Sequence, residues 1–247
     1  PALEAIWPQH WHRCRRERYA QEGMLLQIDA SRHDWLEGRG PYLSLVGAID
    51  DATGTVPYAL FREQEDAQGY FLLLQGILRD KGLPLALYSD RHGIFQRSPK
   101  AADTLVEQLA GELPLTQFGR ALKELGIRPI FALSPQAKGK IERPYQWLQD
   151  HIVRICARDN IKTIAPANQV LFREVHQYNY KWVHSTTKEI PYFRYQRALQ
   201  QKKSVLRQFI IPPPYQSIKD IFCLRMDRVV DNYRTVSINN LQLKFNN

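Results

Sequence analysis

The sequence predicts a mixed α/β fold. Within the first 90 residues, three strand-like segments are followed by an amphipathic segment and then by a fourth strand. This order is typical of proteins in which helices cover a mixed sheet. The chain has 247 residues, of which 44% are hydrophobic, so it can build one sizeable core and a smaller appendage.

The first three strands are predicted by alternation and by one turn. Residues 24–30 alternate so that their apolar side chains share one face, as in a half-buried strand. Residues 42–49 and 55–61 are predicted to form two further strands. The segment between them, 51–54, has the sequence Asp-Ala-Thr-Gly, which favours a tight turn.

The next elements alternate between helix and strand. A helix is expected over 66–80, and a short apolar strand over 84–88. A second helix is predicted over 116–125 and should end at Gly126, because glycine is a common C-cap. A strand over 127–133 should follow it.

One helix is predicted with particular clarity by an apolar stripe. Five apolar side chains recur at helical spacing: Ile141, Tyr145, Leu148, Ile152 and Ile155. Because proline lacks an N–H group, Pro144 is expected in the first turn of this helix, where the loss is harmless. A further helix is expected over 167–183.

The later part of the chain changes in composition. Residues 97–114 are rich in small and charged residues and in proline, which suggests an inserted surface segment. Residues 194–219 contain six cations and no acid. Three prolines at 212–214 indicate a stiff spacer, and residues 220–245 alternate as short strands that are too few to fold alone.

Charge and cysteine usage restrict the function classes. The formal net charge is +9, which makes a polyanionic partner plausible. No segment resembles a signal peptide or a membrane span. The three cysteines are far apart, which argues against a disulfide scaffold and suits a reducing cytoplasm. The chain begins with proline and ends abruptly, so we expect it to be a piece of a longer protein.

Three acidic residues occupy positions that suit a metal site. Asp29 lies in the first strand, Asp90 directly follows the fourth, and Glu142 lies at the start of the striped helix. If the two strands are neighbours and the helix packs beside them, the three carboxylates can converge. Hard cations such as Mg2+ prefer oxygen ligands of this kind. Composition alone would not select these three from the 25 acidic residues.

Three segments in order resemble the integrase catalytic core. They are residues 27–31 (QIDAS), 88–93 (YSDRHG) and 134–143 (SPQAKGKIER). Residues 33–40 and 115–120 further resemble the ISNCY group of insertion-sequence transposases. Each block alone is a weak motif, but three in order with matching connectors are a strong signal.

The resemblance implies a bacterial DDE transposase with an RNase H-like fold. The expected architecture is a mixed five-stranded sheet flanked by helices, followed by a helical connector and part of a small C-terminal β-barrel, since residues 225–236 are similar to the start of the barrel in Mu-type transposases. The implied domains are a basic N-terminal linker at 1–22, an integrase-type catalytic core at 23–160, a helical and basic connector at 161–211, and the start of the barrel at 212–247.

The resemblance also implies a reaction and its partners. Asp29, Asp90 and Glu142 would be the catalytic residues and would hold two Mg2+ or Mn2+ ions. The ions would support cleavage at transposon ends and strand transfer of the 3′-hydroxyl into target DNA. The partners would be double-stranded DNA, both transposon ends and target, and further copies of the chain assembled on that DNA. No membrane partner is expected.

Two departures from the retroviral pattern affect these expectations. Between Asp90 and Glu142 lie 51 residues, against about thirty-five in the retroviral-type motif, and the surplus coincides with the segment at 97–114. Gln146 and Gln149 stand where retroviral integrases place DNA-facing lysines. Cationic DNA contacts are therefore expected elsewhere, at Lys138, Lys140, Arg143, Arg194, Arg197, Lys202 and Lys203.

Other polar residues have simpler interpretations. Asp50 and Asp51 are expected to form the turn before Gly54 rather than to bind metal. His33 and Asp34 are predicted to end a strand, His92 to lie in a polar turn and His184 to have a structural role. Two rival functions stay open: a non-catalytic DNA-binding scaffold derived from a transposase, and an RNase H-type nuclease that cuts without joining.

Overall fold

The computed structural model describes residues 17–97, 115–132, 139–184, 187–226, 228–238 and 241–244. It confirms the predicted mixed five-stranded sheet, whose strand order is β3-β2-β1-β4-β5. The strands are β1 Leu26–His33, β2 Leu43–Asp50, β3 Ala59–Arg62, β4 Ala86–Ser89 and β5 Arg128–Phe131. The first three pair antiparallel, whereas β1–β4 and β4–β5 pair parallel.

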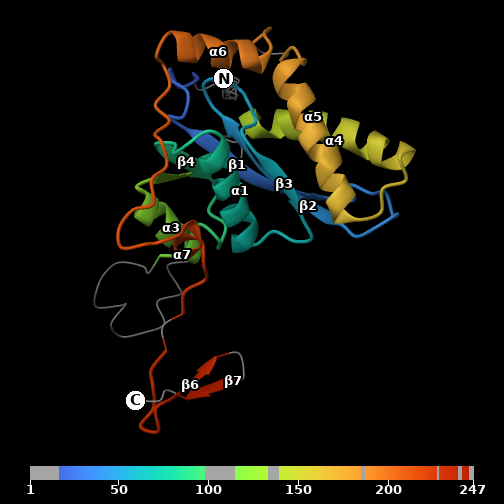
Figure 1. Cartoon of the computed structure of the whole chain (residues 1–247). Helices are drawn as coiled ribbons and strands as arrows, with labels where there is room; N and C mark the ends of the chain where they lie inside the picture. Colours follow the sequence, from blue (N-terminus) through green and yellow to red (C-terminus); the bar gives the residue numbers. More distant parts are fainter. Residues whose placement is uncertain are drawn as a thin grey trace, which may run out of the picture.

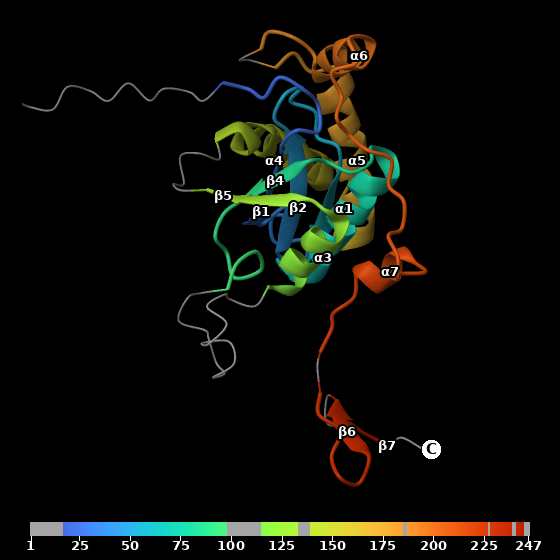
Figure 2. The ribbon, with the colours of Figure 1, turned by 90° about the vertical axis from the view of Figure 1, so that its left-hand side faces the viewer.

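Helices cover both faces of this sheet (Figures 1 and 2). They are α1 Ala67–Asp80, α3 Gln117–Leu125, α4 Gly139–Arg158, α5 Ile164–Tyr180, α6 Pro191–Gln200 and the short α7 Ile218–Ile221. Capping explains where two of them start. The side chains of Asp66 and Thr116 accept hydrogen bonds from the backbone of the first turns of α1 and α3. Gly126 ends α3 in the left-handed conformation, as predicted.

Strand alternation divides the interior into two apolar clusters. Leu26 and Ile28 of β1 face a cluster with α1 and α3, and α7 joins that cluster. On the opposite face, β2 and β3 pack against the apolar stripe of α4 and against α5. The stripe predicted at Ile141, Tyr145, Leu148 and Ile152 is therefore confirmed as the buried side of α4.

The start of α4 differs from the prediction. The helix begins at Gly139, so Pro144 lies in its second turn rather than in its first. A residue at this position would normally donate its N–H to the carbonyl of Lys140. The helix tolerates the missing bond because Ile141 and Tyr145, on either side of the proline, are buried against the sheet.

The strand predicted over 55–61 is shorter than expected because α5 takes over part of its hydrogen bonding. The side-chain amide of Asn179 donates to Val56 O and accepts from Val56 N, both at 2.8 Å. Asn168 likewise accepts a hydrogen bond from Phe61 N at 2.7 Å. Two asparagines of α5 thus bind the edge of the sheet, which joins α5 to the core.

Segments before and after the sheet also pack on it. Glu22 N donates to Lys203 O, and Val205 N donates to Glu22 O. Leu83 and Arg207 exchange a further pair of backbone hydrogen bonds. The N-terminal residues from 17 onward and the connector therefore lie against the core rather than forming separate linkers.

The C-terminal region contains less strand than predicted. Residues between the three prolines and Cys223 pack on the core, where Ile221 is fully buried. Beyond them, β6 Thr235–Ile238 and β7 Leu241–Lys244 form a two-stranded antiparallel sheet. The partial barrel stays a prediction. The inserted segment expected at 97–114 lies almost wholly outside the described residues.

No helix in the described part of the chain is both long and apolar enough to cross a membrane.

The packing of α7 yields a test of where the folded core ends. Ile221 has no exposed surface, so Ile221→Ala should lower the free energy of unfolding by about 2–5 kcal/mol. Val229→Ala is the control, because Val229 is 92% exposed and its truncation should change stability by less than about 0.5 kcal/mol. Denaturant unfolding measures both. An Ile221→Ala protein as stable as wild type would mean that the core ends before the prolines.

Candidate active site

One of the predicted carboxylates, Asp29, lies on β1, and another, Asp90, directly follows β4, the parallel neighbour of β1. In the β1–β4 register, Leu26 pairs with Leu87 and Gln27 pairs with Tyr88. The same register extended by two residues places Asp90 beside Asp29. Residues paired across parallel strands point to the same face, and here that face is the one covered by α4. Both side chains are half-buried.

The third carboxylate lies at the start of α4, and a tyrosine of the same helix fixes that start against β1. The hydroxyl of Tyr145 donates to the backbone carbonyl of Asp29 at 2.6 Å. Glu142 lies three residues earlier, about 4.5 Å along the helix axis, and its side chain is exposed. Tyr145 thus joins the helix that carries Glu142 to the strand residue Asp29.

A glycine makes this contact possible. Gly47 of β2 pairs with Asp29, and a Cβ at Gly47 would lie 3.0 Å from the Tyr145 hydroxyl. A side chain there would press on the tyrosine, so the small residue leaves the hydroxyl its position. Burial, and next the negative charge of Asp29, raise the pKa of Tyr145 well above its usual value. The phenol is therefore a permanent donor.

The three carboxylates do not form a closed metal cluster in this structure. No group of three or more His, Cys, Asp or Glu side chains among the described residues lies close enough to hold a metal ion. Asp90 Oδ1 accepts a hydrogen bond from His92 N at 2.9 Å, which orients that carboxylate. Like charges repel, and a divalent cation would offset this repulsion and favour closer approach.

Asp50 and Asp51 have structural roles, as expected, but different ones. Asp50 forms the turn: its carboxylate accepts from the backbone N–H of Thr53 at 2.7 Å and from that of Gly23 at 2.9 Å. Burial raises its pKa. Asp51 instead is fully buried and binds Lys140 Nζ at 2.8 Å, Gln27 Nε2 at 2.9 Å and the backbone N–H of Tyr19 at 2.7 Å. It connects the N-terminal segment to the start of α4.

The cations predicted to contact DNA fall into two groups. Some bind the protein itself: Lys140 pairs with Asp51, Arg194 donates to Ala52 O at 2.9 Å, and Arg197 pairs with Glu189 at 3.3 Å. Spacing could not reveal these partners, because each is distant in sequence or belongs to a loop.

The remaining predicted cations lie on or near the surface. Lys202 and Lys203 are exposed at the end of α6. Arg143 follows Glu142 on α4 and lines a surface hollow. Lys138 lies outside the described residues.

The histidines match their structural interpretations. His33 Nε2 lies 3.0 Å from Gln149 Nε2, so the end of β1 contacts α4. His92 is exposed in the turn after Asp90. His184 is buried, and burial together with the charges of Arg18, Arg143 and Arg194 lowers its pKa to about 4. It is therefore neutral at physiological pH.

Residues that sequence analysis treated as ordinary also contribute to the site. Tyr145 was predicted only as part of an apolar stripe, and its hydroxyl contact with Asp29 has no local sequence signal. Arg18 donates to Asp51 O at 2.7 Å, across a separation that only the fold closes.

Two curated proteins are related to the chain in sequence, although no family model matches it. The transposase-like protein y4bF of Sinorhizobium fredii is 41% identical over 170 residues, which cover 69% of this chain and 35% of that protein. The transposase for insertion sequence IS1202 of Streptococcus pneumoniae is 33% identical over 180 residues, which cover 72% of this chain and 37% of that protein. The chain spans little more than a third of the length of these curated relatives.

A solved structure supports the fold. A chain of the simian T-cell lymphotropic virus intasome, solved in complex with PP2A regulatory subunit B56 gamma, superimposes with a TM-score of 0.52 and 17% sequence identity. The match covers 74% of this chain and 56% of that chain. The likeness supports the predicted fold, a mixed five-stranded sheet flanked by helices.

Two tyrosines on the same face of the sheet provide a matched test of the Asp29 contact. Tyr145→Phe removes the bond to the Asp29 carbonyl and should cost about 0.5–1.5 kcal/mol of stability. Tyr178→Phe should cost nothing or stabilise slightly, because the Tyr178 hydroxyl is buried with no hydrogen-bond partner among the described residues. Urea unfolding compares the two variants. Equal losses would show that the Asp29 bond does not stabilise the fold.

Proposed function

Since this chain is a homologue of insertion-sequence transposases and has the fold of an integrase catalytic core, we propose that it is the catalytic part of a DDE transposase. Its reaction is hydrolysis at a transposon end, which frees a 3′-hydroxyl, followed by attack of that hydroxyl on a target-strand phosphate. One observation carries the proposal above the others. The hydroxyl of Tyr145 binds the helix that carries Glu142 to Asp29, on the strand whose parallel neighbour ends directly before Asp90.

The donor set suits divalent metal. Asp29, Asp90 and Glu142 offer only carboxylate oxygens, which are the ligands preferred by Mg2+ and Mn2+. Two bound ions would supply activation of the attacking oxygen and stabilisation of the leaving oxygen. Asp29 and Asp90 would lie between or beside the ions, and Glu142 would complete the second position.

The protein's own groups would prepare this site before metal binds. The sheet fixes the backbone of Asp29 between two neighbouring strands, and the turn that includes His92 N orients the Asp90 carboxylate. Glu142 is exposed in the first turn of α4, so its side chain can rotate toward the other two. Preorganised carboxylates lose less conformational freedom when the ions and the DNA phosphate bind.

The proposed partner is double-stranded DNA, as transposon ends and as target. A net charge of +9 favours such a polyanion. We propose that the DNA-bound enzyme is a multimer of this chain and that it is located at the bacterial nucleoid. The exposed cations Lys202 and Lys203, together with Arg197 and Arg143, are the proposed backbone contacts. Lys138, Lys140 and Arg194 remain further candidates, the last two less accessible because they bind the protein.

Removal of each proposed metal ligand tests the chemistry. Asp29→Asn, Asp90→Asn and Glu142→Gln should reduce cleavage and joining to background while the protein stays folded, because each change keeps the shape and removes the charge that attracts Mg2+. Asp34→Asn is the matched control, since Asp34 caps a nearby turn by accepting from Gly38 N. Strand-transfer assays on a labelled end and Mn2+ binding measure the effect.

The outcomes separate the rival functions. A wild-type chain that cuts but never joins would be an RNase H-type nuclease. One that binds DNA and shows neither activity nor Mn2+ binding would be a scaffold. Full activity in Asp29→Asn would refute the assignment of the site.

The basic surface at the end of α6 has its own test. Replacing Arg197, Lys202 and Lys203 together with Gln should weaken binding to all duplex sequences alike. Each lost phosphate contact should reduce the slope of log affinity against log salt by about 0.9. Arg79→Gln is the control, because Arg79 is an exposed cation on α1 that pairs with Asp80. An unchanged slope would mean that this surface faces only solvent.

A further inference from the structure

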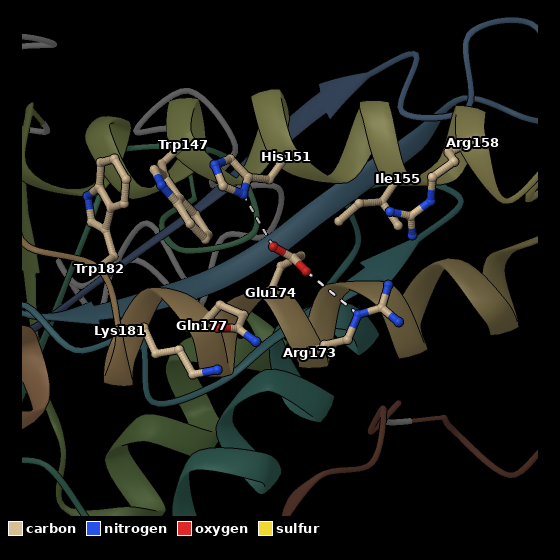
Figure 3. A pocket seen from close by; sticks show the side chains of 9 residues that line it. All are labelled: Trp147, His151, Ile155, Arg158, Arg173, Glu174, Gln177, Lys181 and Trp182. Atoms are coloured by element: carbon tan, nitrogen blue, oxygen red, sulfur yellow. Dashed lines mark hydrogen bonds and ion pairs between the residues drawn. The ribbon is translucent and has the colours of Figure 1, made fainter.

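A groove runs along the outer side of α4 and α5, away from the sheet (Figure 3). Its volume is about 410 Å³, within the range of pockets that hold small organic ligands. Rings gather at one end, where Figure 3 shows Trp147, His151 and Trp182, and guanidinium groups gather at the other. The proposed metal site does not use these groups, and of the three rings Trp147 also packs against the core.

The rings form a stacked cluster that ends in an exposed indole. Trp147 and His151 stack at a centroid distance of 3.9 Å with an interplanar angle of 28°. The ring centroid of Trp182 lies 5.5 Å from that of Trp147 (Figure 3). Trp182 is 42% exposed, directly after the end of α5. A tryptophan of this exposure offers a flat π surface to a ligand.

The polar lining of the groove is cationic with one fixed acceptor. Its lining includes three cationic side chains and one carboxylate: Arg158, Arg173, Lys181 and Glu174. The Glu174 side chain is nearly buried, and it lies 3.4 Å from His151 Nδ1 and 3.6 Å from Arg173 Nε. These contacts hold the carboxylate in place, and its remaining lone pairs can accept from a ligand amino group. Gln177 adds both a donor and an acceptor.

A second hollow lies nearer the start of α4. It has a volume of about 300 Å³, shares Trp147 and Trp182 with the groove and is also lined by Arg143. Arg143 directly follows Glu142, and Trp147 lies about 7.5 Å along the helix from Glu142. Along α4, the second hollow therefore lies between the groove and the residue proposed as the third catalytic carboxylate.

We propose that this groove binds a short unpaired strand of the DNA substrate, with one base stacked on Trp182 and successive phosphates at Lys181 and Arg173. This inference rests on the proposed function, because it takes DNA as the partner. Stacking on an indole accepts any base, since every base has a π face. Glu174 can accept a hydrogen bond from a base N–H group, such as the N3–H of thymine, and Gln177 can both donate and accept.

Charge and shape favour an unpaired nucleotide over duplex DNA or a protein. In a duplex the base faces are buried in the stack, so only phosphates and groove edges could reach the groove. A protein partner would usually bury an apolar centre with few charges, whereas this groove carries three cations and a carboxylate. An indole beside phosphate-binding cations is the combination used for single strands.

Binding of a short fluorescent oligothymidylate, measured by anisotropy in EDTA, tests the proposal. Trp182→Ala should weaken binding roughly 5- to 100-fold, the loss expected from one stacked base. Trp182→Phe should retain much of the affinity, because a phenyl ring still stacks. Tyr42→Ala is the matched control, since Tyr42 is 56% exposed on another part of the surface. Arg173→Gln and Lys181→Gln should each reduce the salt slope by about 0.7.

Three results would overturn the proposal. The first is unchanged single-strand affinity in Trp182→Ala. The second is an equal loss for the oligothymidylate and for a blunt duplex, which would make the groove a general phosphate surface. The third is a Trp182→Ala protein that changes from dimer to monomer in sedimentation with unaltered single-strand affinity, which would make the groove an interface between copies.

The assay is independent of catalysis. No divalent ion is present, so the measurement involves neither cutting nor joining. Loss of single-strand binding in Trp182→Ala beside normal binding in Tyr42→Ala would support the groove even if cutting and joining failed. If the wild-type protein cuts and joins DNA while Trp182→Ala keeps full single-strand affinity, the proposed function stands and the groove proposal is refuted.

Discussion

The hydrogen bond from Tyr145 to the Asp29 carbonyl is the contact on which the candidate site depends. It is 2.6 Å long and joins α4 to the central strand at the residue that carries the first carboxylate. Because the hydroxyl is buried and stays protonated, the bond persists over the physiological pH range. Gly47 provides the space for it on the neighbouring strand. Together these residues fix the helix start near the strand ends.

The rest of the fold supports this contact from both faces of the sheet. α1 and α3 bury one face, and α4 and α5 bury the other. Asn168 and Asn179 bind α5 to the sheet edge through backbone hydrogen bonds. Asp51 holds Lys140 at the start of α4 and the N-terminal segment together. A rigid scaffold of this kind would hold the proposed catalytic side chains within the small tolerance that phosphoryl chemistry requires.

The candidate site was predictable where it depends on single strands and helices, and unpredictable where it depends on distant partners. Asp29 and Asp90 became candidates through their strand positions and motif resemblance, and the parallel pairing of β1 with β4 places the two strands that lead to them side by side. Charge patterning, in contrast, could not tell that Lys140 and Arg194 bind Asp51 and Ala52 rather than face outward. The partners of these cations lie roughly ninety or more residues away, so only folding brings them within reach.

The sequence by itself determined the mixed sheet, its helices and the positions of three acids, because alternation, helical periodicity and capping are local properties of the chain. Tertiary structure decided which β-strand lies beside which, why the third strand starts late, and that α7 belongs to the core although prolines precede it. It also assembled Trp147 and His151 of α4 with Trp182, which follows α5, into one aromatic cluster. Such contacts depend on packing between distant segments, which no local pattern encodes.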